Sequence, residues 1–129
     1  MDKTGILLSG IGKVLDSHGN IEFAYLFGSY ADGNAFPASD IDIAVYLSSG
    51  PAGLNDELVL HTMLSRELKC NNVDLIMINN TRNIILLEDI IKNGKVIYDK
   101  NSPLREQFEL KVFHSAIDFK FQRKVFAGR

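Results

Sequence analysis

The sequence predicts an α/β (α+β) fold, with a small mixed sheet of about four strands flanked by helices. Segments in which apolar residues recur at helical spacing alternate along the chain with short runs of branched and aromatic residues typical of strands. The chain has 129 residues, of which 46% are apolar, and this suits one hydrophobic core better than two. Because no repeat or linker divides it, residues 1–129 are predicted to form a single domain.

The first elements are a helix and a strand. Apolar residues recur at helical spacing over about residues 4–17, and Gly19 or Asn20 is able to take the left-handed conformation that ends a helix. Residues 21–27 are apolar, rich in aromatic and branched side chains, and short enough for a strand. The segment 31–39 is rich in turn-forming residues.

A second strand and a second helix follow. Residues 41–47 are predicted to form the strand, and Asn55 is a candidate N-cap for a helix that runs to about Lys69. The side chains expected on the inner face of this helix are Leu58, Val59, Thr62, Met63 and Leu68.

The last third of the chain predicts two further strands and two helices. Residues 73–78 and 95–98 indicate strands, and residues 83–92 indicate a short helix that ends at Asn93-Gly94. Pro103 suits the first turn of a final helix, about residues 103–126.

Composition and charge exclude several classes of protein. The net charge is −2, so no overall positive field predicts direct binding of nucleic acid. No apolar run approaches the roughly 18 residues that a membrane span needs. The single cysteine, Cys70, excludes an internal disulfide and a cysteine-based zinc cluster, and together these features predict a cytoplasmic protein.

Two acids interrupt the second predicted strand. Residues two apart in a strand point to the same face, so Asp40 and Asp42 are predicted to lie side by side, with Ile41 and Ile43 on the other face. Two neighbouring carboxylates repel each other unless a cation lies between them, and Mg²⁺ prefers such oxygen ligands. The pair therefore predicts a magnesium site.

A third acid, Asp74, lies near the start of the strand predicted at 73–78. If the two strands are neighbours, Asp74 joins Asp40 and Asp42, and three carboxylates can hold two metal ions about 3.5–4 Å apart. Such two-metal sites serve phosphoryl and nucleotidyl transfer. Gly28 and Ser29, at the end of the first strand, complete the pattern, because a glycine and a serine hydroxyl can cradle phosphate oxygens.

Each feature alone has a structural explanation. Asp-x-Asp is common in solvated turns and caps, and Asp74 alone could cap a turn or pair with Arg66. The combination of Gly-Ser, a fixed gap, Asp-x-Asp within an apolar run and a later strand-borne acid favours the metal site.

These motifs resemble the signature of the DNA polymerase β-like nucleotidyltransferases. The resemblance is carried by the string LFGSYADGNAFPASDIDIAV, by VDLIMI as the third-acid strand and by IIKNGKVIYD as the last strand. Length and layout are similar to those of the minimal nucleotidyltransferases (MNT), the antitoxins of MNT/HEPN toxin–antitoxin pairs. Many relatives carry a basic residue where this chain has Asp32, which either points to solvent, lowers ATP affinity or marks a partner contact.

The resemblance implies a protein adenylyltransferase that uses Mg²⁺ and ATP. It implies transfer of AMP to a tyrosine of a cognate HEPN ribonuclease, which neutralises that toxin. Gly28 and Ser29 would hold the triphosphate, Asp40 and Asp42 would bind metal, and Asp74 would complete the site and help to deprotonate the attacking hydroxyl. Two alternatives remain: an antitoxin that acts by occlusion alone, and a nucleotidyltransferase that acts on a small molecule.

The predicted C-terminal helix carries more apolar side chains than one packed face requires. It either packs across the sheet with a frayed basic end, or it docks a partner or a second copy of the chain. The apolar side chains at helical spacing are Leu104, Phe108, Val112, Ile117, Phe121 and Val125.

Overall fold

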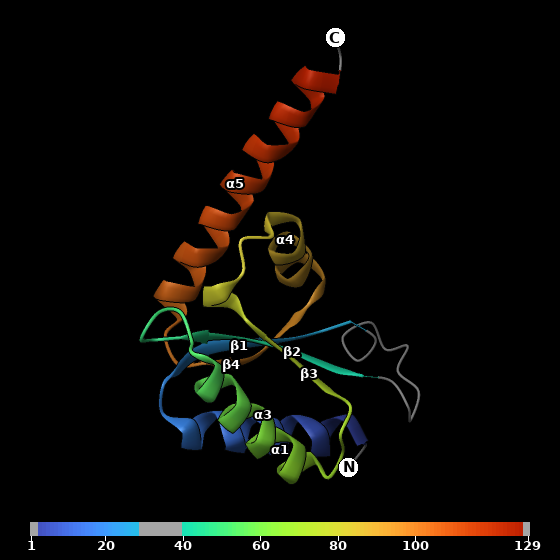
Figure 1. Cartoon of the computed structure of the whole chain (residues 1–129), viewed down its shortest axis with the longest axis vertical. Coiled ribbons are helices and arrows are strands. Elements are labelled where there is room, and N and C mark those ends of the chain that lie inside the picture. Colours follow the sequence, from blue (N-terminus) through green and yellow to red (C-terminus); the bar gives the residue numbers. More distant parts are fainter. Residues whose placement is uncertain (1–2, 29–39, 128–129) are drawn as a thin grey trace.

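The computed structural model describes residues 3–28 and 40–127 and confirms the predicted fold class (Figure 1). A four-stranded sheet has helices on both faces. The strands are β1 (Ile21–Phe27), β2 (Ile41–Leu47), β3 (Val73–Met77) and β4 (Lys95–Asp99). The helices are α1 (Lys3–His18), α3 (Leu54–Leu68), α4 (Ile84–Asn93) and α5 (Ser102–Ala127), with a short 3₁₀ helix, η1 (Ile78–Asn80), after β3.

The sheet has the order β3-β2-β1-β4 and is mixed, as predicted. Strand β1 pairs antiparallel with β2 and with β4, whereas β2 and β3 are parallel. Parallel neighbours require a crossover, and here α3 supplies it. As a result β3 is an edge strand, and its first residues lie beside the first residues of β2.

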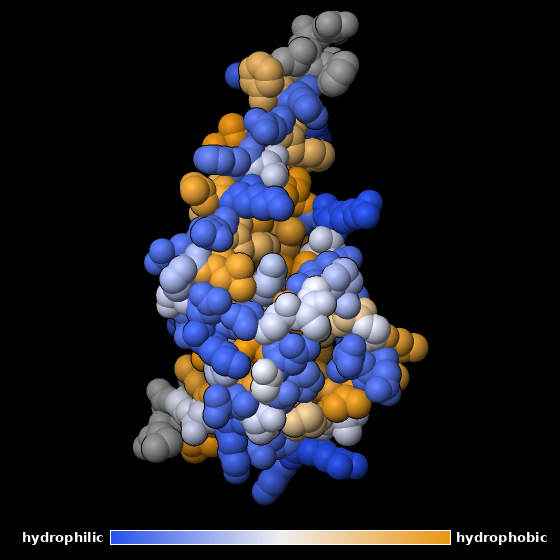
Figure 2. All heavy atoms as spheres, turned by 90° about the vertical axis from the view of Figure 1, so that its left-hand side faces the viewer, coloured by the Kyte–Doolittle hydropathy of each residue, from blue (hydrophilic) through white to orange (hydrophobic). Residues whose placement is uncertain are grey.

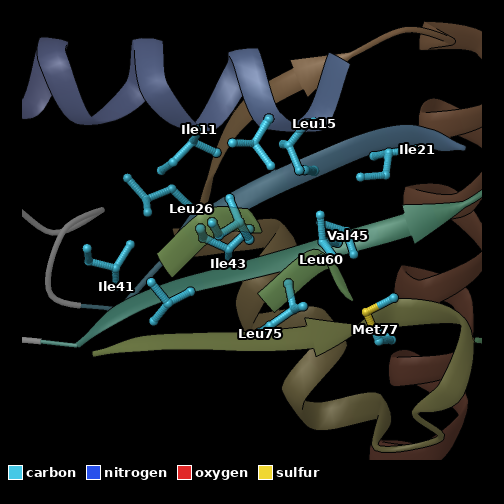
Figure 3. Close-up of a cluster of buried hydrophobic side chains, with 14 of the residues drawn as sticks. Ile11, Leu15, Ile21, Leu26, Ile41, Ile43, Val45, Leu60, Leu75 and Met77 are labelled. Atoms are coloured by element: carbon cyan, nitrogen blue, oxygen red, sulfur yellow. The ribbon is translucent and has the colours of Figure 1, made fainter. Parts of the chain in front are cut away.

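Helices α1 and α3 pack together on one face of the sheet. Figure 3 shows the cluster of buried side chains between them and the strands, with Ile11 and Leu15 from α1, Leu60 from α3, and Ile43 and Val45 from β2. The other members of β2 that enter this cluster, Ile41 and Leu47, follow the same alternation. Helices α4 and α5 cover the opposite face, which receives Ala44 and Tyr46.

The predicted inner face of α3 was partly wrong. Leu58 and Val59 are 55% and 44% exposed, and Thr62 is exposed, whereas Met63 and Leu68 pack partly against the core. The fully buried side chains are those of Leu60 and Leu64. Periodicity was ambiguous here because the apolar run from Leu58 to Leu60 offers several adjacent faces.

The predicted N-cap of α3 was also wrong. Gly53 is the N-cap, and its backbone N–H donates a hydrogen bond of 3.3 Å to Oδ2 of Asp56. The helix predicted over residues 83–92 is confirmed as α4, and its N-cap is Asn83, whose side chain accepts a 3.1 Å hydrogen bond from the backbone N–H of Leu86. The end of α1 is confirmed at Gly19, which has a φ of +79°.

The N-terminal part of α5 packs on the sheet. Val112 and Ala116 are buried, and the ring of Phe108 lies 5.5 Å from those of Phe23 and Tyr46. The buried hydroxyl of Tyr25 donates a hydrogen bond of 2.7 Å to Glu109. Burial and this carboxylate raise the pKa of Tyr25.

The C-terminal part of α5 projects beyond the sheet (Figure 1). It is joined to α4 by an ion pair of 2.6 Å between Lys120 and Glu88. Ile117 and Phe121 are 62% and 66% exposed, and Figure 2 shows apolar residues among hydrophilic ones along this part of the helix. Packing of the C-terminal helix across the sheet is therefore confirmed for its N-terminal half, and docking of a partner or a second copy of the chain stays a prediction.

None of the helices in the described part of the chain is long and apolar enough to cross a membrane.

We predict that Leu60→Ala lowers the free energy of unfolding by about 2–5 kcal/mol, because it leaves a cavity in the core beneath α3. Leu58→Ala on the same helix is the matched control and is expected to change it by less than about 0.5 kcal/mol. Urea denaturation at neutral pH measures both. Equal losses would show that the face of α3 is assigned incorrectly.

Candidate active site

The parallel pairing of β2 and β3 brings two of the predicted acids together. Asp42 and Asp74 are partners in the register, and the pairing begins with a 2.8 Å hydrogen bond from the backbone N–H of Ile41 to the carbonyl of Asn72. Since Ile41 and Ile43 enter the core on the α1–α3 side, Asp42 points to the face that α4 and α5 cover farther along the sheet. Asp40, which directly precedes β2, is exposed.

The close approach of these acids changes the titration of Asp42. Burial, followed by the charges of Asp74 and Asp40, raises the pKa of Asp42 from 3.8 to about 6. The side chain of Asp42 also forms a hydrogen bond with Asp74. Because two ionised carboxylates cannot donate to each other, this hydrogen bond requires a proton shared by the two carboxyl groups. When both groups are ionised, a cation between them would be needed instead.

Gly28 lies against the same carboxylate from the other side. It follows β1, whose last residue, Phe27, pairs with Asp42, and it has a φ of +72°. A Cβ on Gly28 would clash with Oδ2 of Asp42 and come within 3.2 Å of its Cγ. The sequence predicted that this glycine allows a phosphate to approach the backbone. The contact with Asp42 is a separate requirement that the motif did not reveal.

Ser29 and Asp32 lie outside the described residues, so their predicted roles stay predictions. Within the part of the chain that the structure describes, no group of three acidic, histidine or cysteine side chains is arranged to hold a metal ion. The structure thus brings Asp42 and Asp74 into contact and places Asp40 near enough to repel Asp42, without a ready three-ligand cluster.

The chemistry of these donors fits a divalent cation. Carboxylate oxygens are the hard ligands that Mg²⁺ prefers. The charge of the ion would also lower the raised pKa of Asp42 and relieve the repulsion between the neighbouring carboxylates. Asp42 and Asp74 would hold the ion, with Asp40 as a further ligand from the start of β2.

Other titratable or reactive groups have structural roles. The Nε2 atom of His61 lies 2.9 Å from the carbonyl oxygen of Val73, and Cys70 packs partly against the core. A cavity of about 570 Å³ under α5 includes Tyr46, four residues after Asp42 and so about 13 Å along the strand. None of the three aspartates lines it.

Fold and acids together define a nucleotidyl-transfer type of domain, in which a mixed sheet presents carboxylates from adjacent strands. The family model described as Polymerase beta, Nucleotidyltransferase matches residues 10–103. The chain therefore belongs to the polymerase beta nucleotidyltransferase family. A search of curated proteins finds no significant match.

Several solved structures share this fold along nearly the whole chain. One is a toxin–antitoxin with AMP-PNP, with 24% identity, a TM-score of 0.80 and coverage of 94% of this chain and 95% of that one. A second is the complex of tri-AMPylated Shewanella oneidensis HEPN toxin with MNT antitoxin, with 22% identity, a TM-score of 0.76 and coverage of 97% and 96%. A third is the toxin-antitoxin MntA-HepT, with 22% identity, a TM-score of 0.73 and coverage of 96% of both chains.

We predict that Gly28→Ala destabilises the protein by about 1 kcal/mol more than Gly50→Ala does. Both glycines have positive φ, but only a Cβ on Gly28 meets a neighbour, the carboxylate of Asp42. The difference between the two variants in urea denaturation isolates that contact. Identical losses would mean that the approach of Gly28 to Asp42 does not constrain the fold.

We predict that Asp42→Asn raises the melting temperature in EDTA at pH 8 by about 3–5 °C, because it removes a carboxylate whose ionisation is disfavoured by burial and by the charges of Asp74 and Asp40. Since the group is partly exposed to solvent, this cost is about 1 kcal/mol. A raised pKa in the folded state means that ionisation of Asp42 destabilises the fold above about pH 6 and has no effect below its ordinary value of 3.8. The gain should therefore vanish near pH 3.5. Asp118→Asn, an exposed acid on α5, is the control in thermal denaturation scans.

Proposed function

We propose that this protein is a Mg²⁺-dependent antitoxin that transfers AMP from ATP to a tyrosine hydroxyl of a cognate HEPN ribonuclease toxin. The observation that carries the proposal is the contact between Asp42 and Asp74 at the start of two parallel strands, in a member of the polymerase beta nucleotidyltransferase family. The similarity to structures described as a toxin–antitoxin with AMP-PNP and as a tri-AMPylated HEPN toxin with MNT antitoxin supports the choice of nucleotide and acceptor.

The transfer forms one bond and breaks one bond. The tyrosine oxygen attacks the α-phosphorus of ATP, the bond from that phosphorus to the oxygen bridging to the β-phosphate breaks, and pyrophosphate leaves. The tyrosine proton passes to a carboxylate of the site. Mg²⁺ held by Asp42 and Asp74 would neutralise charge on the phosphates and favour ionisation of the attacking hydroxyl.

The residues of the chain would divide these tasks. Asp42, held between Gly28 and Asp74, is the fixed metal ligand, since its neighbours on both sides limit its movement. Asp40 is exposed and would complete the coordination. Asp74 lies on an edge strand, is exposed, and is therefore the carboxylate that an incoming hydroxyl can reach, either as metal ligand or as proton acceptor.

We predict that Asp42→Asn and Asp74→Asn each lower AMP transfer at least about 100-fold, because each removes a ligand charge from the reacting centre. The test incubates a cognate HEPN protein with the antitoxin, Mg²⁺ and ATP, and measures the intact mass of the HEPN protein. A gain of one or more AMP units with the wild-type protein and with Asp118→Asn, but not with the two site variants, is the expected result.

The exposed apolar side chains of Ile117 and Phe121 favour a second candidate, neutralisation by binding alone. In that case the toxin stays inactive with the Asp42→Asn variant, and no mass gain occurs with the wild-type protein. Transfer of AMP to a small molecule with no protein acceptor would instead support the small-molecule alternative.

A further inference from the structure

We infer that His61 on α3 is a positioning residue, which holds Asp74 beside Asp42 through the backbone of β3. The inference rests on the proposed function, because it concerns how the acids of that site are kept in place. Three observations carry it: the position of β3 at the edge of the sheet, the hydrogen bond of His61 to its backbone, and the place of that bond next to Asp74.

Strand β3 is the part of the site that the sheet holds least firmly. It has five residues and lies at the end of the strand order, and among the described strands only β2 pairs with it. Strand β2, by contrast, is paired on both sides. Since a strand paired on one side opens locally more easily, the position of Asp74 depends on contacts at the outer side of β3.

The register shows which backbone groups of β3 face outward. Ile41 is the partner of Val73, and its N–H donates a 2.8 Å hydrogen bond to the carbonyl oxygen of Asn72. In a parallel ladder a residue bonds to the residues before and after its partner, so the N–H of Asp74 also faces β2. The backbone groups of Val73 itself therefore point to the open side of the strand.

His61 binds the outward carbonyl group of Val73. Its Nε2 atom lies 2.9 Å from that oxygen, and because a carbonyl oxygen can only accept, Nε2 carries the hydrogen. The Nδ1 atom lies 3.5 Å from the hydroxyl oxygen of Ser65, one turn farther along α3, which can donate to it. The ring is half-buried, so water competes less for this bond than it would at an uncovered strand edge.

The bond acts on the peptide unit that precedes Asp74. The carbonyl of Val73 and the N–H of Asp74 belong to one planar group, which is held by His61 on the outer side and by β2 on the inner side. This group sets where the Cα of Asp74 lies, and therefore where its carboxylate projects. His61 acts only through this backbone, because its helix packs on the face of the sheet opposite to the carboxylates.

A small displacement of Asp74 is expected to have a large effect on the chemistry. A shift of about 1 Å in a reacting group, caused by a change elsewhere in the protein, can slow a reaction about 100-fold. If the start of β3 loosens, Asp74 moves away from Asp42 and the site loses its exposed ligand or proton acceptor. His61 would thus affect the rate of transfer without contact with ATP or the acceptor.

Two substitutions of His61 separate hydrogen bonding from packing. His61→Leu removes the donor and keeps an apolar side chain, whereas His61→Gln keeps an N–H that can donate to the same carbonyl. The control is Asn79→Ala, because the half-buried Asn79 side chain binds the backbone of Leu47, at the opposite end of β2, with hydrogen bonds of 2.7 and 3.0 Å. Urea denaturation establishes that each variant is folded.

The first measurement is hydrogen exchange at the backbone amide of Asp74, followed by NMR on the protein alone. We expect His61→Leu to raise this exchange rate about 3- to 10-fold, the effect of losing one hydrogen bond, and His61→Gln to restore most of the protection. Asn79→Ala should leave exchange at Asp74 within about 2-fold of wild type. The amide of Ala44, in the centre of β2, should change little in either His61 variant.

The second measurement is the kinetics of AMP transfer to a cognate HEPN protein with Mg²⁺ and ATP. His61→Leu should lower kcat about 10-fold or more and change the KM for the HEPN protein by less than about 3-fold, because His61 touches neither reactant. His61→Gln should recover most of the lost rate, and Asn79→Ala should transfer AMP at the wild-type rate.

Unchanged exchange at Asp74 in His61→Leu would show that the bond does not hold β3 and would overturn the inference. A wild-type kcat despite faster exchange, failure of His61→Gln to restore either property, or an equal loss with Asn79→Ala would also overturn it. Absence of transfer by the wild-type protein would instead overturn the proposed function, and hydrogen exchange would still decide whether His61 holds Asp74 in place.

Discussion

The contact between the carboxyl groups of Asp42 and Asp74 is the constraint on which the site depends. The register of β2 and β3 makes the two residues partners, and burial and charge together raise the pKa of Asp42 to about 6. The fold holds the pair in place from the opposite face, where Ile41 and Ile43 enter the core between the sheet and helices α1 and α3. A cation at this position would convert the repulsion into an attraction.

The crossover that creates this pairing also shapes the surface beside it. Two parallel strands cannot be joined by a tight turn, so β2 and β3 are connected through α3, which packs against the sheet on the side opposite to the acids. Because β3 is an edge strand, the outer side of α3 borders its free edge. The same connection therefore places Asp74 beside Asp42 and leaves a groove between α3 and the edge of β3, on the face of the sheet away from the two carboxylates.

The strands and the acids could be predicted from the sequence because their signals are local. An acid within a short apolar run, such as Asp42, is visible without knowledge of the fold. The position of β3 beside β2 depends on the order of the strands in the sheet, which local patterns do not reveal. The sequence therefore predicted the third acid of the site only on the condition that the two strands are neighbours. The contact of Gly28 with Asp42 joins two strands across the sheet, so no spacing rule could reveal it. The exposure of Leu58 was missed for a related reason, since a continuous apolar run does not define one helical face.

Two pairs of exposed apolar side chains, one on α3 and one on α5, differ in their position relative to the acids. Leu54 and Leu58 on α3 adjoin a groove on the face of the sheet opposite to the side chains of Asp42 and Asp74. Ile117 and Phe121 lie on the C-terminal part of α5, on either side of Lys120, whose ion pair with Glu88 joins this part of the helix to α4. A contact at α5 could hold a partner or a second copy of the chain, but it could not by itself present an acceptor to the site. A contact on α5 and transfer at the acids would thus use separate surfaces, and this separation is why variants at Asp42 and at Phe121 distinguish an adenylyltransferase from an antitoxin that only covers its target.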